Sequence, residues 1–178
     1  MKQRVFITLM ISILLTGCSK KVVEEEVTME QLMINEGIVY EEVLVTVPYD
    51  SEYGFAIYTT EEGIGNAQFS TVNGQWNYTG STEFSSANTA ESPIISFGMT
   101  HWEMNDGVES DRQPVAIIAG EITDEVSRIE IEFDEDVKEG KIVKGDERTI
   151  WYWAGGYSSL ERVEVRAFDQ ASKVIDSR

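Results

Sequence analysis

The clearest pattern along the chain is strict alternation of apolar and charged residues in two segments near the C-terminus. In residues 128–133, RIEIEF, Ile129, Ile131 and Phe133 share one side and the charged residues share the other. Residues 162–167, RVEVRA, alternate in the same way. A period of two residues is typical of strands with one buried face. We therefore predict two half-buried strands whose opposite charges would pair across the sheet if the strands are neighbours.

Most of the remaining chain reads as short strands separated by turns. Residues 39–78 alternate between β-branched or aromatic segments and turn-forming residues, and they include Asn73-Gly74, a strong signal for a tight hairpin turn. These residues are predicted to form an antiparallel meander. The run from Val115 to Ala119 is apolar without interruption, as in a central strand covered on both faces.

One segment and one helix interrupt the strand pattern. Residues 81–92 are small and polar, which predicts either a long surface loop or a junction between two sub-sheets. Thr28 and Gln31 have the spacing of a capping box, which predicts a short helix that begins after Thr28 and ends at Gly37. Its apolar side would be formed by Met29, Leu32 and Met33.

Many short strands with little helical periodicity predict a mainly β fold. The expected architecture is an antiparallel β-sandwich or an open barrel after a short N-terminal helix, with an immunoglobulin-like arrangement left open. The strand order does not follow from the pattern.

The N-terminus has the features of an export signal. Lys2 and Arg4 precede an apolar run over residues 5–15, which is too short to span a bilayer, and the run ends in Leu15-Thr16-Gly17-Cys18. This tetrapeptide resembles the lipobox of bacterial lipoproteins. The resemblance implies that the thiol of Cys18 receives a diacylglyceryl group and that the chain is cut before it. An ordinary signal peptide with an incidental cysteine is the alternative.

Residues 1–21 as a whole resemble the small surface lipoproteins of Gram-positive bacteria, and this resemblance implies no function for the rest of the chain. It places the protein at the cell membrane, on the extracytoplasmic face, attached through lipid. The expected organisation is a signal peptide over residues 1–17, a lipidated tether with a short helix over 18–37, and a β domain over 38–178. An internal junction at 79–93 is left open.

The chain is strongly acidic, with a net charge of −18. Removal of residues 1–17 takes away Lys2 and Arg4 and no acid, which leaves 12 basic and 32 acidic residues and a net charge of −20. Such a surface repels nucleic acid and anionic lipid headgroups and attracts cationic proteins. The simpler explanation is that the charge keeps an exposed protein soluble.

The chain offers few residues for catalysis or cofactor binding. His101 is the single histidine and Cys18 the single cysteine, so a transition-metal site with several such ligands is excluded, and no nucleophile elbow occurs. We expect His101 to pack beside Trp102 as a structural residue. Residues 63–68, GIGNAQ, lack the third glycine of a dinucleotide fingerprint and are predicted to be a turn.

Two acid-rich stretches are candidate calcium sites. The first contains Asp106, Glu109 and Asp111, and the second spans residues 134–139. Neither has the spacing of a calcium-binding helix-loop-helix, so we expect solvated acidic turns, no metal and no cofactor.

The most aromatic segment, residues 149–157, TIWYWAGGY, is the candidate ligand site. As a strand it places Trp151 and Trp153 on one face. These two tryptophans either form an exposed stacking platform for sugar rings of cell-wall glycan or fill the core, and the core interpretation is favoured because large aromatics dominate cores.

The sequence therefore predicts a lipid-anchored binding or envelope-structural protein without catalysis of its own. Two alternatives stay open. One is an envelope glycan hydrolase with a pair of carboxylates, which 32 acidic residues can neither nominate nor exclude. The other is an inhibitor that captures cationic lysozyme-like proteins.

Overall fold

A computed structural model describes residues 27–85, 92–102, 114–133, 136–157 and 162–178. The chain begins there with helix α1 (Met29–Asn35), where the Thr28 side chain accepts a hydrogen bond from the backbone N–H of Gln31 at 3.1 Å. Gly37 follows with a φ of 75°, a conformation that favours glycine. The predicted capped helix is confirmed.

Four consecutive strands form an antiparallel meander in the order β1-β2-β3-β4. They are β1 (Glu42–Pro48), β2 (Tyr53–Thr60), β3 (Gly63–Val72) and β4 (Gln75–Ser85). Asn73 and Gly74 both have positive φ, 54° and 78°, as a type I′ hairpin turn requires. The meander predicted over residues 39–78 is confirmed, and it continues seven residues further.

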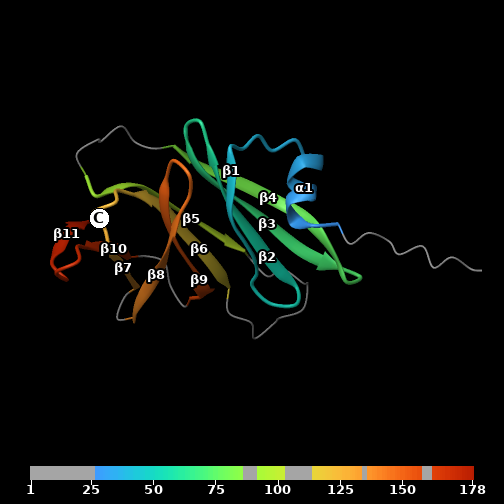
Figure 1. Ribbon diagram of the computed structural model, residues 1–178. Helices are drawn as coiled ribbons and strands as arrows, with labels where there is room; N and C mark the ends of the chain where they lie inside the picture. The colour runs from blue at the N-terminus through green and yellow to red at the C-terminus, as the bar shows by residue number, and fades with distance from the viewer. Residues whose placement is uncertain (1–26, 86–91, 103–113, 134–135, 158–161) are drawn as a thin grey trace, which may run out of the picture.

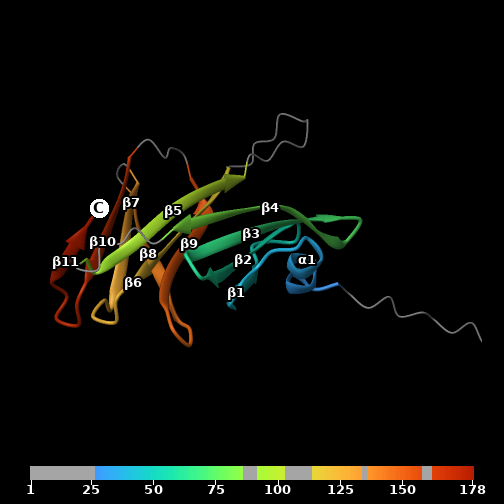
Figure 2. The same cartoon turned by 90° about the horizontal axis from the view of Figure 1, so that it is seen from above.

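The remaining strands form a second sheet of seven, in the order β11-β10-β7-β8-β9-β6-β5. They are β5 (Ile94–Trp102), β6 (Val115–Ile122), β7 (Arg128–Phe133), β8 (Asp136–Lys144), β9 (Thr149–Gly156), β10 (Val163–Phe168) and β11 (Val174–Ser177). β8 pairs with β7 up to Gly140 and with β9 from Lys141, so the sheet curls at this corner into a half-barrel. Figures 1 and 2 show this sheet beside the meander, with α1 on the meander's far side.

This arrangement confirms the mainly β class, with a sandwich of two sheets of which one is partly rolled. It is not immunoglobulin-like, because an immunoglobulin sheet combines strands from separate parts of the chain, whereas β1 to β4 are consecutive.

Three apolar clusters hold these layers together. The first lies between α1 and the meander, the second lies between the two sheets, and the third fills the curl of the seven-stranded sheet. Their respective members include Met29, Met33, Tyr58 and Phe69; Val45, Phe55, Ile57, Ile117 and Tyr152; and Ile118, Ile129, Ile131, Trp151 and Val165. β6 contributes to the second and third clusters and is buried along its whole length, as predicted for a central strand.

The two strands in which apolar and charged residues alternate, β7 and β10, are neighbours. This was the condition for their opposite charges to pair. β10 runs antiparallel to β7, with Arg166 opposite Glu130 and Glu164 opposite Glu132. The Arg166 guanidinium forms ion pairs with Glu132 and, at 2.8 Å, with Glu164. The side chains are about one-third exposed, so solvent screens each ion pair and its contribution to stability is small.

One predicted turn, and the first part of a segment predicted to be a loop or a junction, are strands. Residues 63–68 lie within β3, where Gly65 is opposite Tyr58; a Cβ on Gly65 would lie 2.4 Å from Tyr58 Cζ. A glycine is therefore needed here so that the Tyr58 ring can pack closely against the backbone. The residues around Gly65 in the sequence give no sign of this ring. The loop predicted over residues 81–92 is also wrong for its first five residues, which extend β4. The chain passes from one sheet to the other between Ser85 and Ile94, so the interpretation as a junction between sub-sheets is the one that the topology bears out.

A β-bulge changes the face that β4 buries. Phe69 pairs with Tyr78 and Gln68 pairs with Gly80, so Thr79 has no partner on β3. Before the bulge, Tyr78 packs in the cluster beneath α1; after it, Phe84 packs between the sheets. One extra residue thus lets a single strand serve two layers.

Asp176 connects the two edges of the seven-stranded sheet. Its carboxylate on β11 accepts hydrogen bonds from the Ser92 hydroxyl and, at 3.1 Å, from the backbone N–H of Ile94 at the start of β5. Burial raises the pKa of this carboxyl, but the bonds from Ser92, Ile94 and Ser177 and the charge of Arg178 together hold it below its ordinary value. The ionised carboxylate therefore stabilises the curled sheet.

No helix among the described residues has the length and apolar character needed to cross a membrane.

Candidate functional site

The structure separates the two tryptophans that the sequence placed together. They do share a face of β9, the one toward the half-barrel cluster, but Trp151 is fully buried and only Trp153 is partly exposed. The Trp153 ring packs 4.8 Å, centroid to centroid, from that of Phe133. A stacking platform with both indoles exposed is therefore wrong, and the core interpretation is confirmed for Trp151.

Several of the other candidate residues lie outside the described ranges: Cys18, the acidic stretch at residues 106–111, Asp134 and Glu135. His101 is exposed on β5. Within the described ranges, no three His, Cys, Asp or Glu side chains come together in a way that could hold a metal ion.

The opposite face of β9 borders an aromatic cleft of about 430 Å³ between the two sheets. This size falls within the usual range for small-ligand sites. The aromatic cleft is lined by Val47, Pro48, Tyr49, Phe55, Glu139, Lys141, Tyr152, Trp153 and Ala154. It thus combines residues from β1, β2, β8 and β9 with the turn that follows β1.

The floor of the aromatic cleft is rigid. Phe55 and Tyr152 are buried and meet edge to face, with ring centroids 5.8 Å apart and an interplanar angle of 68°. Above them, Tyr49 is half-buried, and its backbone N–H donates to the Tyr53 carbonyl at 2.8 Å. Both sheets therefore contribute to the aromatic surface, and the contact between Phe55 and Tyr152 holds its base in place.

The bend in β8 supplies the polar side of the aromatic cleft. At the corner, a Cβ on Gly140 would lie 3.1 Å from both Ile129 Cγ2 and Trp151 Cε3, so a larger residue would crowd the half-barrel core. On either side of this glycine, Glu139 and Lys141 are exposed toward the cleft. An adjoining cleft of about 610 Å³ shares Glu139, Lys141 and Tyr152 and continues toward Arg128.

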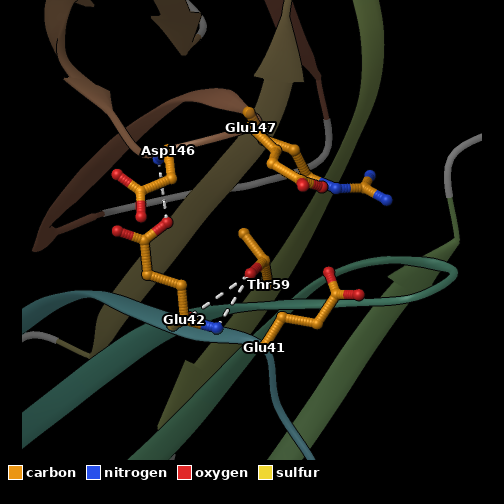
Figure 3. Close-up of a pocket in the computed structure, with 6 residues that line it drawn as sticks. Glu41, Glu42, Thr59, Asp146 and Glu147 are labelled. Carbon is orange, nitrogen blue, oxygen red and sulfur yellow. Dashed lines mark hydrogen bonds between the residues drawn. The ribbon is translucent and has the colours of Figure 1, made fainter.

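A second, smaller pocket of about 210 Å³ lies at the other end of β1 and is strongly acidic (Figure 3). Glu42 lines it from the start of β1 and Glu41 from the residue before that strand. Thr59 lines it from the end of β2, and Asp146 and Glu147 line it from the turn between β8 and β9. Glu42 and Val47 are five residues apart on β1, so this acidic pocket and the aromatic cleft are separated by about 17 Å.

The polar groups of the acidic pocket fasten the two sheets. Glu42 Oε2 accepts a hydrogen bond from the backbone N–H of Asp146 at 3.1 Å, and Thr59 Oγ1 accepts one from the backbone N–H of Glu42 at 3.1 Å (Figure 3). Beside them, Arg148 forms an ion pair with Glu121 at 2.9 Å and donates to the Glu61 carbonyl at 3.2 Å. These contacts explain the pocket as a clamp between the sheets.

Sequence reasoning named Trp153, which lines the aromatic cleft, but missed the other residues of the cleft. Tyr49 follows Pro48 and reads as part of a turn, whereas Phe55 and Tyr152 are separated by almost a hundred residues. The alternation in residues 149–157 does place Tyr152 opposite the tryptophans, but this pattern does not tell which face borders a cleft.

Comparisons with protein-family models, with curated proteins and with solved structures find no match to this chain.

Proposed function

We propose that this protein is a lipid-anchored, extracytoplasmic binding protein that holds a sugar of the cell envelope in the aromatic cleft and has no catalysis of its own. The observation that supports the proposal is the preformed aromatic floor bordered by two exposed charged side chains. The anchor is an expectation from the lipobox at Cys18, and the tether before Thr28 would link it to the β domain.

A sugar suits this cleft because its ring has an apolar C–H face and a polar rim. The apolar face would lie against Tyr49 and the edge of Tyr152, while Glu139 and Lys141 would bond to groups on the rim. Ligand sites commonly combine such aromatic walls with a few polar groups that fix orientation.

Isothermal titration with a soluble fragment of wall glycan tests the proposal. Tyr49→Ala should weaken binding at least about tenfold, equivalent to about 1.4 kcal/mol. Tyr40→Ala is the matched control, because Tyr40 is also half-buried but packs 6.3 Å from Tyr58 near α1. Equal loss in both variants, or binding unchanged by Tyr49→Ala, would contradict the assignment.

Capture of a cationic protein is the second candidate, and the acidic pocket favours it. Four acidic residues from two segments about a hundred residues apart line it: Glu41, Glu42, Asp146 and Glu147. Such binding would depend on long-range attraction and weaken steeply with salt. Titration with hen-type lysozyme or polylysine at low and high ionic strength distinguishes it, because sugar binding by stacking should change little with salt.

A further inference from the structure

We infer that the aromatic cleft selects a sugar that carries a carboxylate, with Lys141 as the residue that recognises it. This inference rests on the proposed function and names the ligand class of the same site. It starts from the charge distribution on β8, the strand that forms the polar side of the cleft.

Lys141 differs from the other lysines of its strand. Lys138 lies 3.4 Å from Asp136, and Lys144 lies 3.6 Å from Asp124. Within the described residues, the ammonium of Lys141 makes no ion pair and no hydrogen bond; it lies over the Tyr152 ring, 5.8 Å from the centroid. An unpaired cation is unexpected in a chain with 32 acidic and 14 basic residues, where carboxylates are abundant.

The position of the unpaired Lys141 ammonium suits it to bind a ligand. Lys141 is exposed, borders the aromatic cleft, and also borders the adjoining cleft toward Arg128. A carboxylate placed beside the ring of Tyr152 would meet the ammonium above the aromatic floor, and charge-assisted hydrogen bonds are about twice as strong as neutral ones.

Glu139 narrows the ligand class further. It is two residues before Lys141, so both side chains point to the same face of β8, one as an acceptor and one as a donor. A ligand that fits both must offer an N–H or O–H group as well as a carboxylate. An N-acetylated sugar with an acidic substituent has this combination, since its amide N–H can donate to Glu139 while its carboxylate meets Lys141.

N-acetylmuramic acid and N-acetylglucosamine are the probes, because they differ by a single lactyl ether that bears the carboxylate. Calorimetric titration of the full chain should show preferential binding of N-acetylmuramic acid by roughly tenfold, and Lys141→Met should abolish this preference by weakening the binding of N-acetylmuramic acid far more than that of N-acetylglucosamine. Lys144→Met, which removes a charge from the same strand outside the cleft, should retain the preference.

The outcomes separate this inference from the proposed function. Equal binding of the two sugars by the wild-type protein, or a preference that survives Lys141→Met, would overturn the role of Lys141 and leave sugar binding intact. Absence of binding by both sugars would overturn the proposed function and this inference with it.

Discussion

Replacing Trp151 with alanine tests whether the half-barrel cluster is a tightly packed core. Trp151 is fully buried, and two glycines lie against its indole. A Cβ on Gly120 would lie 2.6 Å from Nε1, and one on Gly140 would lie 3.1 Å from Cε3. Because these neighbours are strand backbone, they cannot move in to fill the space, and we expect a loss of about 3–5 kcal/mol in the free energy of unfolding.

The indole N–H provides a second, sharper expectation. Within the described residues, Nε1 of Trp151 is buried without a hydrogen-bond partner, and such a group costs about 1–3 kcal/mol. Trp151→Phe removes this group and keeps most of the ring, so its cost should be less than half that of Trp151→Ala.

Equilibrium urea unfolding, followed by far-ultraviolet circular dichroism, measures both variants. With a typical slope of about 2 kcal/mol per molar urea, Trp151→Ala should lower the midpoint by roughly 2 M. An alanine variant that unfolds at the wild-type midpoint would refute the core assignment, and a phenylalanine variant as unstable as the alanine one would refute the unpaired N–H.

Three further predictions address the seam of the half-barrel, the meander and the anchor. The pKa of Asp176 is below its ordinary value of 3.8, so the carboxylate stabilises the fold above pH 3.8 and this stabilisation is lost as the pH falls through the lowered pKa. Asp176→Asn should therefore reduce the acid-dependent loss of melting temperature below about pH 4. An unchanged acid profile would contradict this. Gly65→Val should cost about 1–3 kcal/mol because it collides with Tyr58, whereas Gly80→Ala, with open space around its Cβ, should be nearly neutral in the same thermal melt. Cys18→Ala should abolish labelling by a fatty-acid probe, and incorporation that persists would exclude this cysteine as the lipidation site.

The sequence predicts those parts of the fold whose pattern is local. The alternation in residues 128–133 and the Asn73-Gly74 turn depend only on strand geometry and backbone conformation, and both are found as expected. The same logic fails at Gly65, because two glycines in the stretch 63–65 suggest a turn unless the ring opposite Gly65 is known.

The candidate site depends on contacts that no local pattern contains. The aromatic cleft requires that β8 change partners at Gly140, which brings Lys141 beside Tyr152, and that β1 lie across the sandwich from them. Strand order sets these neighbours, and period-two alternation is the same for every order. Trp151 and Trp153 are large aromatic side chains that suit either a ligand site or a core, and the fold buries Trp151 completely.

The most direct test of sugar binding is to map it onto the backbone by nuclear magnetic resonance. On addition of N-acetylmuramic acid, the account predicts chemical-shift changes that cluster at Val47 to Tyr49, Glu139 to Lys141 and Tyr152 to Ala154, the segments that line the aromatic cleft. The acidic pocket, about 17 Å away along β1, should remain unchanged. Changes centred on Glu42 and Asp146, or no changes at millimolar sugar, would contradict the account.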